Sequence, residues 1–489
     1  MGQKLKIAGL LSAGALAGAL ASISLQTAAR GALAPLPLEE LQQLAEVFSM
    51  IKTNYVEPVD EKKLITDAIA GMVAGLDPHS VYLDQKALKD FNEGTTGKFV
   101  GVGIEISQED GYIKIVSPIE DSPAFKAGLK PGDLIVKIDN TPVKGLTLNE
   151  GVKRMRGEPD TQVLLNIFRK NESRTFDVTI KREVIKTQSV KARLVEPGYG
   201  WVRLSQFQER TVADFARKVE DLYKQEPKLK GLVLDLRNDP GGYLDAAVAI
   251  SSAFLPDNVT VVSANGQLPD SKFTYKAAPK YYARHGDDPL DQLDPVTRKA
   301  LRKVPLVVLV NEGSASASEI VAGALQDHQR AKLLGSQTFG KGSVQTAVCL
   351  DAAFRMDNCP TAALKLTTSR YYTPSGKSIQ AKGIVPDVMI DETEQGNLFA
   401  ALRTREADLE KHLVSGQDAE VKDAAREKER EDARKKLEAE MKKPTDDRKL
   451  PEYGSNKDFQ LQQALLQLKG LPVMVSKTQV ERAEEKKDN

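Results

Sequence analysis

Residues 304–319 read VPLVVLVNEGSASASE, and the character of the sequence changes at the middle of this stretch. The first half is a continuous apolar run, which is typical of a buried strand. The second half places small residues and three alternating serines ahead of an apolar-periodic segment that begins at Ala317, the pattern of a helix start. A buried strand that passes through a tight turn into a helix is a building unit of layered α/β folds. The loops that follow such strands commonly carry functional side chains.

The flanking sequence repeats this strand–turn–helix pattern. Strands are predicted at residues 201–204, 232–236 and 333–334, and helices at residues 212–223, 244–254 and 317–328. The strand that ends at Leu236 runs into residues 237–242, RNDPGG, a second tight turn before a helix. We therefore expect an α/β core over residues 184–395, interrupted by a polar, proline-containing insertion at residues 266–303.

The composition of the chain limits the partners and cofactors that we expect. The 489 residues are enough for two to four domains, and 69 Lys plus Arg balance 68 Asp plus Glu. This balance gives no electrostatic case for nucleic acid as the main partner. The four histidines form no HExxH motif and the two cysteines form no CxxC motif, so we expect neither a metal site nor another cofactor. Any hydrolysis is expected to proceed through side chains alone.

Residues 1–35 have the pattern of a targeting segment. Lys4 and Lys6 precede an uncharged stretch rich in Ala and Gly at residues 7–25, and small residues follow. We interpret the segment as an export signal, with an uncleaved membrane anchor or a buried Ala/Gly helix as alternatives. Export would place the protein in the periplasm or cell envelope. In that oxidising space Cys349 and Cys359 either pair or remain two thiols.

Three further regions flank the core and make the chain an α/β multidomain protein. Residues 36–96 have helical apolar spacing, which Asn92-Glu93-Gly94 is expected to close. Residues 97–183 alternate as short strands around one helix near residues 148–155. Residues 396–489 form a charged extension, with a run of both signs at residues 420–443 that predicts a solvated helix or a partly disordered arm. The amphipathic stretch at residues 459–468 is suited to dock on the body or on a second subunit.

The region at residues 97–183 resembles a PDZ domain. Residues 99–104, FVGVGI, are similar to a PDZ carboxylate-binding loop, and residues 127–133, AGLKPGD, are similar to a typical PDZ turn. The resemblance implies capture of a peptide C-terminus as an added strand, its carboxylate held by backbone N–H groups. The glycines could instead only shape a bulge. The expected peptide-binding residues are Val100, Gly101, Val102, Gly103 and Ile104. Arg156, after the short helix, is either a sensor of the bound peptide or a solvated surface charge.

Chemistry is expected at Ser316. The residues Ser316-Ala317-Ser318-Glu319 fit a capping box, so this serine could simply cap a helix. The same position places a hydroxyl beside a helix N-terminus, where free N–H groups and the helix dipole stabilise developing negative charge. Small neighbours leave room for a substrate.

Lys341 lies 25 residues after Ser316, in the sequence TFGKGSVQ at residues 338–345. A phosphate-binding P-loop needs Ser or Thr after the lysine, and Gly342 stands there, so nucleotide binding is disfavoured. A plain surface lysine remains an alternative. A serine hydroxyl needs a base to become a nucleophile, and a lysine whose pKa is lowered by burial can serve. Gln345 would orient the lysine by hydrogen bonding.

Three segments and one further residue resemble those of the carboxyl-terminal processing proteases, also called tail-specific proteases: residues 236–242, 314–324 and 338–345, together with Asp327. That family combines an export signal, a PDZ domain and a serine–lysine protease core related to the crotonase fold. The resemblance implies Ser316 as nucleophile, Lys341 as general base and Gln345 as the residue that orients the base. It selects the middle serine, which spacing alone does not. The oxyanion hole would combine the N–H of Ala317 with that of Gly241 or Gly242, and Asp327 would give structural support. Gly241 and Gly242 could also form only a turn, and Asp239 stands where Asn is often found.

The expected function is therefore a serine endopeptidase that recognises protein C-termini, preferably apolar ones, and cleaves peptide bonds through an acyl-enzyme. Its partners would be protein substrates, with an activating partner or a second copy bound through the helical terminal regions. Two other classes remain open. A catalytically silent PDZ adaptor would not need Lys341, and an enzyme of CoA thioesters would bind CoA.

Overall fold

The computed structural model describes residues 36–119, 121–284, 286–394, 396–397, 403–415, 431, 434–435, 438–439 and 453–476. The expected targeting segment (residues 1–35) and most of the charged run at residues 420–443 lie outside these residues. The chain divides into two units between Gly71 and Met72. Within the described residues, no helix combines the length and the apolar character needed to cross a membrane.

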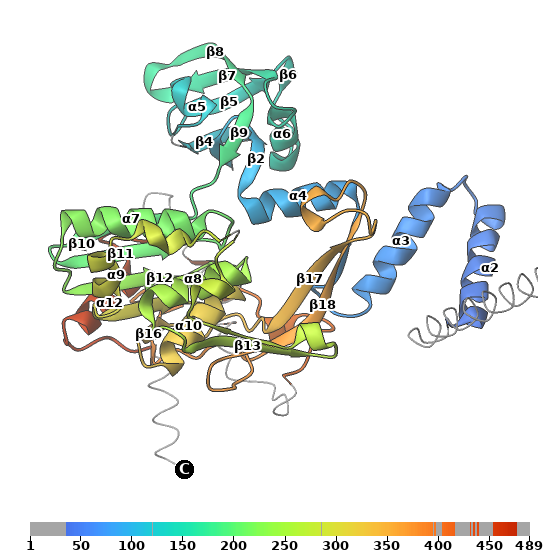
Figure 1. Cartoon of the computed structure of the whole chain (residues 1–489). Coiled ribbons are helices and arrows are strands. Elements are labelled where there is room, and N and C mark those ends of the chain that lie inside the picture. Colours follow the sequence, from blue (N-terminus) through green and yellow to red (C-terminus); the bar gives the residue numbers. More distant parts are fainter. Residues whose placement is uncertain are drawn as a thin grey trace, which may run out of the picture. The chain divides into compact units, whose positions relative to one another are not determined.

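The expected helical region is divided into several elements (Figure 1). Helices α2 (Leu38–Asn54) and α3 (Glu61–Ala74) are followed by a short strand, β1 (Val81–Leu83), and by α4 (Gln85–Thr96). The prediction that the helical part closes at residues 92–94 is wrong, because α4 continues to Thr96. It ends where Gly97 takes a left-handed conformation with φ 69°. The side chains of α2 are all at least partly exposed within its own unit.

The β-rich region is an antiparallel sheet with strand order β3-β4-β5-β7-β8. Its strands are β3 (Ile104–Glu109), β4 (Tyr112–Pro118), β5 (Leu134–Ile138), β7 (Gln162–Arg169) and β8 (Arg174–Lys181), with β6 (Thr141–Pro142) paired to β5. The helices are α5 (Pro123–Lys126) and α6 (Leu148–Met155). The apolar strand residues and Met155 form one buried core. Strand β3 lies at the edge of this sheet, so one side of its backbone is unpaired with the other described strands.

Residues 98–109 form two strands that belong to different sheets. Strand β2 (Lys98–Gly101) ends before β3 begins and pairs instead with β9 (Glu183–Lys186), where the chain leaves the domain. The break falls at Val102-Gly103, and Gly103 has a φ of 80°. A positive φ is accessible to glycine at little cost, so the chain can turn here between two strands that belong to different sheets.

The α/β core is built on a six-stranded sheet of order β10-β11-β12-β15-β16-β19. Its strands are β10 (Val190–Glu196), β11 (Tyr199–Leu204), β12 (Gly231–Asp235), β15 (Leu306–Val310), β16 (Lys332–Gly335) and β19 (Val388–Met389). All neighbouring pairs are parallel except β10 with β11. The α/β prediction is confirmed. The continuous apolar runs of β12 and β15 are explained by burial on both faces.

Different helices pack on the two faces of this sheet. Helices α7 (Thr211–Gln225), α8 (Leu244–Phe254) and α10 (Ala317–Asp327) share one buried cluster with Leu234 and Val308. The alternate residues Val233 and Val307 belong to a second cluster, which is closed by Leu461 and Leu465 of α12 (Phe459–Leu468). The amphipathic C-terminal stretch therefore docks on the body of its own chain (Figure 1).

A second sheet carries the remaining part of the site. Strand β18 (Ala363–Tyr372) pairs with β17 (Ser343–Cys349) along one edge, and with β1 and then β13 (Thr260–Gly266) along the other. Strand β14 (Phe273–Lys276) extends this sheet, and it lies with α9 (Pro295–Leu301) inside the insertion at residues 266–303. Cys349 and Cys359 form a disulfide with a Cα–Cα distance of 5.6 Å. It clips the loop between β17 and β18.

Candidate active site

Ser316 lies on a strained turn between β15 and α10. Its φ of 54° and ψ of −110° are unusual for a residue with a side chain and cost on the order of 1–3 kcal/mol. The residue is the N-cap of α10, and its N–H donates to Oε2 of Glu319 at 2.8 Å. Its hydroxyl makes no hydrogen bond with any other described residue. The capping function expected from the sequence is therefore carried by Glu319 and not by the serine hydroxyl.

The geometry distinguishes Ser316 from the two serines beside it. The hydroxyl of Ser314 donates to the carbonyl of Leu236 at 2.8 Å, and that of Ser318 donates to the carbonyl of Asp239 at 2.9 Å. Both side chains are fully buried. These bonds tie the turn to the loop after β12 and leave the middle hydroxyl available for chemistry. The structure thus supplies the distinction that the spacing of the serines could not.

The loop after β12 approaches the same turn. A Cβ built on Gly241 would lie 2.8 Å from both the Cβ of Ser316 and the nitrogen of Ala317, so only glycine fits here. The N–H of Gly241 donates to Oδ1 of Asp239 at 2.9 Å. The N–H groups of Ala317 and Gly242, in contrast, have no hydrogen-bond partner among the described residues. Of the two glycines predicted for the oxyanion hole, Gly242 is the one with an unoccupied donor.

The same loop contains a buried carboxyl, that of Asp239, whose pKa is raised. The side chain is fully buried, and its Oδ2 atom has no hydrogen-bond partner among the described residues. Burial raises the pKa of Asp239 to about 8, although the bond from Gly241 N–H opposes the shift. A neutral carboxyl here avoids repulsion of a negative charge that develops beside Ser316. Asparagine, which the family resemblance led us to expect here, is neutral at every pH.

Lys341 is tied to the serine turn through its backbone. Its N–H donates to the same Oε2 atom of Glu319 that accepts from Ser316, at 2.9 Å. Burial and the positive charge of Lys365 lower the pKa of Lys341 to about 8, against the opposing charges of Glu406, Glu319 and Asp77. A substantial fraction of the amine is therefore neutral near pH 8, as a general base requires.

Glu319 is the residue whose importance sequence reasoning missed. Its carboxylate is fully buried and accepts four hydrogen bonds, from the N–H groups of Ser316, Gly340 and Lys341 and from the hydroxyl of Thr338. Burial raises its pKa to about 7, and the hydrogen bonds limit this shift. The capping box signalled only the bond to Ser316. Nothing in the sequence indicated that the same carboxylate would bind the loop at residues 338–341.

Gln345 lies on β17 and is held by its amide nitrogen. This nitrogen donates to Ser343 Oγ at 2.9 Å and to Thr367 Oγ1 at 3.1 Å. Both amide hydrogens are thereby used, and the carbonyl oxygen Oε1 is left to accept. No direct bond between Gln345 and Lys341 is present in the described structure, so its orienting role stays a prediction.

Asp327 and the histidines near the site have structural contacts. Asp327 is the last residue of α10, and the N–H of Ser375 donates to its Oδ2 at 2.8 Å. It lies ten positions after Ala317 on the same helix, about 15 Å along the axis. His328 contacts the carbonyl of Thr260 at 2.7 Å, and His79 contacts Oε2 of Glu406 at 2.7 Å. The supporting role expected of Asp327 stays a prediction.

The predicted peptide-binding loop precedes the edge strand of the PDZ-like sheet. Val100 and Gly101 end β2, Val102 and Gly103 form the connection, and Ile104 begins β3. The free edge of β3 is the geometry needed to add a peptide strand.

Arg156, the C-cap of α6, faces neighbouring elements rather than open solvent alone. It forms an ion pair with Glu93 of α4 at 2.7 Å, and its guanidinium lies 5.2 Å from the ring centroid of Phe99. The residue therefore connects the β-rich domain with α4 and with the start of the predicted peptide-binding loop.

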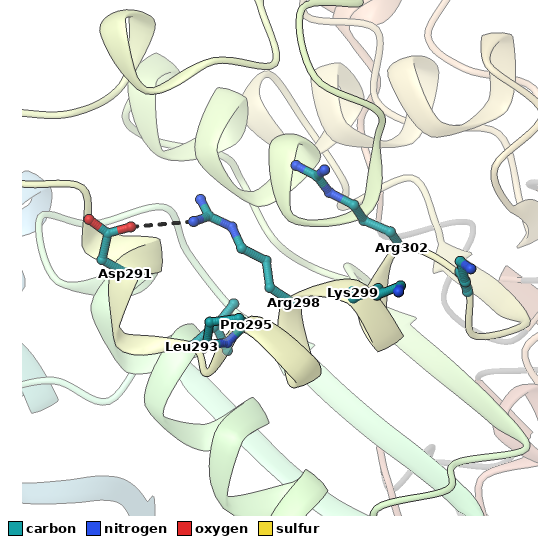
Figure 2. Close-up of a pocket in the computed structure, with 7 residues that line it drawn as sticks. Asp291, Leu293, Pro295, Arg298, Lys299 and Arg302 are labelled. Atoms are coloured by element: carbon teal, nitrogen blue, oxygen red, sulfur yellow. Dashed lines mark hydrogen bonds and ion pairs between the residues drawn. The ribbon is translucent and has the colours of Figure 1, made fainter.

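Two cavities lie away from Ser316. One, of about 790 Å³, is lined by α4 together with Phe99 and Val100. The other, of about 430 Å³, lies at α9, and Figure 2 shows Arg298 and Arg302 lining it. Arg298 is paired with Asp288 and Asp291, and Arg302 with Asp257. The described residues contain no group of three metal-ligating side chains.

Comparison with known proteins places the chain among peptidases. The model of peptidase family S41 matches residues 198–390, the PDZ domain model matches residues 100–180, and the model of the activating protease CtpB N-terminal domain matches residues 12–87. A carboxy-terminal-processing protease of Bartonella bacilliformis is 44% identical over 356 residues, 72% of this chain and 76% of that protein. The carboxy-terminal processing protease CtpA of Bacillus subtilis is 34% identical over 360 residues, 73% of this chain and 71% of that protein. The solved structure of a photosystem II D1 C-terminal processing protease is 32% identical, covering 71% of this chain and 86% of that chain, with a TM-score of 0.39.

These matches define a serine-type peptidase that carries a PDZ domain and acts on protein substrates. The chain belongs to the carboxy-terminal processing proteases of peptidase family S41.

Proposed function

We propose that this protease cleaves peptide bonds with a Ser316–Lys341 dyad. The observation that carries the proposal is the shared Glu319 oxygen, which binds the N–H groups of both residues, together with the lowered pKa of Lys341. Neutral Lys341 takes the proton of Ser316, and Oγ attacks the peptide carbonyl to form a tetrahedral intermediate. We assign its oxyanion to the N–H groups of Ala317 and Gly242, which have no hydrogen-bond partner among the described residues.

The remaining steps return the enzyme to its starting state. The Lys341 ammonium gives its proton to the leaving amine, the C–N bond breaks, and an acyl ester remains on Ser316. Lys341, again neutral, takes a proton from water as the water oxygen attacks the ester carbonyl. The second tetrahedral intermediate collapses, the C–O bond to Ser316 breaks, and the serine regains its proton. The peptide substrate and one water molecule are the only groups from outside the chain that this proton balance needs.

We further propose that the PDZ domain selects substrates by their C-termini. The edge strand β3 and the loop at residues 100–104 support this proposal, because an added strand and a carboxylate need free backbone groups of this kind. We propose that an apolar terminal side chain packs on partly buried apolar residues of this domain, such as Ile104 at the start of β3 and Leu148 of α6. The Arg156–Glu93 ion pair is a candidate route by which peptide binding reaches α4.

The proposed location is the periplasm or cell envelope, with residues 1–35 as export signal or anchor. The disulfide between Cys349 and Cys359 supports an oxidising compartment.

We also propose that the protease binds a second copy of itself or an activating protein through its N-terminal helices. Leu41, Leu44 and Val47 of α2 are exposed within the described structure, and the matching domain model is that of an activating protease.

The test uses residues 35–489 as a purified protein and an unfolded substrate with an apolar C-terminus. We expect the wild-type chain to degrade it and Lys341→Ala and Ser316→Ala to leave it intact. Labelling with a serine-reactive fluorophosphonate should modify Ser316 alone. Equal cleavage by wild type and Lys341→Ala would refute the dyad. A wild-type chain that binds the tail but neither cleaves nor reacts would indicate the PDZ adaptor instead.

A further inference from the structure

We propose that Thr367 and Asp77 are positioning residues of the catalytic site, and that they fix the side-chain amide of Gln345 so that its carbonyl oxygen is presented to the Lys341 amine. This inference deepens the proposed function and rests on it. It adds to the site a loop from the N-terminal part of the chain, the residues Asp77-Pro78-His79-Ser80, and a hydroxyl on β18.

The strand pairing brings these residues together. Gln345 on β17 is the cross-strand partner of Thr367 on β18, with a local register shift beside Gln345. On the opposite edge of β18, β1 pairs through Val81 and Lys365, so the loop that ends at Ser80 lies next to Thr367. The N–H of Thr367 donates to Ser80 Oγ at 3.1 Å, which holds loop and strand in register.

Asp77 is the centre of this loop. Its carboxylate accepts from the N–H groups of His79 and Ser80 at 2.8 and 3.0 Å, from the Ser80 hydroxyl at 2.6 Å and from the Thr367 hydroxyl at 3.0 Å. Burial disfavours the charge, but these hydrogen bonds outweigh burial and lower the pKa of Asp77. The carboxylate is therefore ionised at neutral pH, and it can accept hydrogen bonds but cannot donate one.

The single hydrogen of the Thr367 hydroxyl determines the orientation of the Gln345 side-chain amide. The Thr367 hydroxyl has one hydrogen, and Asp77 takes it. Towards Gln345 the same oxygen can only accept, so it must face the amide NH₂ and not the amide oxygen. The second amide hydrogen goes to Ser343 Oγ. In the reverse orientation, Oε1 of Gln345 would face Oγ1 of Thr367, and neither oxygen would have a hydrogen to donate to the other. Oε1 is thus the one polar atom of this side chain left for another donor.

The Lys341 amine is a donor without a hydrogen-bond partner among the described residues, and we infer that it is the donor to Oε1. The charges that act on Lys341 are those of Lys365 on β18, Glu406, Glu319 on α10 and Asp77, and His79 is bound to Glu406. Asp77, which fixes the amide through Thr367, is therefore within electrostatic reach of the amine. An oxygen presented to the ammonium stabilises the charged form and orients the amine towards Ser316.

The test compares Thr367→Val with Thr367→Ser in the full-length protease. Valine keeps the shape and removes the oxygen, whereas serine keeps the oxygen. Thr368→Val is the matched control. Among the described residues, the neighbouring Thr368 hydroxyl pairs only with Thr346, at the exposed face of the same hairpin. We expect Thr367→Val to lower kcat about 10- to 100-fold with unchanged KM. We also expect it to move the acidic limb of the kcat profile to lower pH, because the ammonium loses an acceptor. Thr367→Ser should restore both quantities.

The kinetics of these variants distinguish a positioning role of Thr367 from a packing role. Wild-type kcat and pH profile in Thr367→Val would overturn the inference, and so would equal impairment of Thr367→Ser, which would indicate packing alone. If Thr367→Val does not fold, Thr367→Ala removes the same oxygen without adding an apolar branch and is compared with Thr367→Ser in the same way. Lys341→Ala separates the two proposals. An active Lys341→Ala refutes the dyad itself, whereas an inactive Lys341→Ala with a fully active Thr367→Val refutes only the positioning role.

Discussion

The main-chain N–H groups of Ser316 and Lys341 donate to one and the same atom, Oε2 of Glu319, at 2.8 and 2.9 Å. The two amide nitrogens can therefore be no farther apart than the sum of these distances. The residues are 25 positions apart in the sequence and lie on different elements, a helix start and the loop before β17. A buried carboxylate is the physical link between the proposed nucleophile and the proposed base.

Replacing Glu319 by glutamine should break this link. A carboxylate accepts two hydrogen bonds at each oxygen here, whereas a glutamine amide presents an NH₂ group at one of the two positions. In either orientation two buried donors face that NH₂ group and lose their acceptor. Each unsatisfied donor lowers the free energy of unfolding by about 1–3 kcal/mol. We expect a lower melting temperature and a loss of kcat larger than any change in KM.

The control for this substitution is Glu410→Gln, which makes the same chemical change at an exposed position. Calorimetry and steady-state kinetics on both variants provide the measurement. A Glu319→Gln protein as stable and as active as Glu410→Gln would show that the carboxylate does not hold the two loops together.

The second prediction concerns pH. Lys341 must be neutral to act as base, and its pKa is lowered to about 8, so kcat/KM should rise with pH and level off above that value. Lys365 contributes to this lowering because its positive charge disfavours the Lys341 ammonium. Lys365→Gln removes that charge and should raise the pKa of Lys341, which moves the acidic limb to higher pH by up to about one unit.

The measurement is a kcat/KM profile between pH 6 and pH 10, approximately the range over which an amine with this pKa titrates. Lys303→Gln, which changes an exposed lysine in the turn after α9, is the matched control and should leave the limb in place. A limb that moves to lower pH in Lys365→Gln, or that does not move, would contradict the proposed electrostatic role of Lys365.

The parallel core could be predicted from the sequence because its signals are local. The apolar runs of β12 and β15 and the small-residue turns after them indicate strand, turn and helix within about fifteen residues each. The second sheet was not predicted, since β17 and β18 carry polar residues at partly buried positions, among them Gln345, Thr367 and Lys365. Such strands lack the hydrophobic alternation on which sequence reading depends.

The site shows the same division between local and long-range signals. Ser316 and Glu319 could be joined as a capping box because they are three residues apart. The bonds of Glu319 to residues 338–341 span about twenty residues of intervening structure, and those of Asp77 to Thr367 span 290 positions. Long-range hydrogen bonds of this kind are set by tertiary packing, which leaves no periodic trace in a single sequence. The roles of Ser316, Lys341 and Gln345 therefore remain predictions that the variants above address.

The third prediction tests the PDZ loop. Gly103 has a φ of 80°, and a Cβ there would lie 2.3 Å from the Cβ of Ser122. Gly103→Ala must displace the loop that begins β3, so we expect weaker binding of a peptide with an apolar C-terminus in fluorescence anisotropy. Gly111→Ala is the control: this turn glycine has the same φ of 80°, but its nearest neighbouring atom would be 3.8 Å away. Equal peptide affinity in the two variants would exclude the loop as the carboxylate-binding site.

The fourth prediction concerns the C-terminal segment, whose residue Asp458 binds the buried Arg237 through both carboxylate oxygens, at 2.9 and 2.7 Å. Arg237 directly precedes the loop that carries Gly241 and Gly242. Asp458→Ala leaves the guanidinium with unpaired N–H groups in the interior and should lower the free energy of unfolding by about 3–5 kcal/mol. Lys469→Ala, which removes a more exposed ion pair with Glu196 on the same segment, should cost at most about 1 kcal/mol.

Fluorescence of the single tryptophan, Trp201, can follow this unfolding locally. Its indole N–H donates to Asp235 at 3.1 Å, and Asp235 is also bound to Arg237, so the probe lies in the same buried network. A Cβ on Gly454 would come within 2.6 Å of the indole ring, which shows how closely the C-terminal segment covers it. We therefore expect urea unfolding of Asp458→Ala to change the tryptophan signal at a lower midpoint than in Lys469→Ala. Coincident midpoints for the two variants would mean that the C-terminal segment contributes nothing specific to the stability of this face.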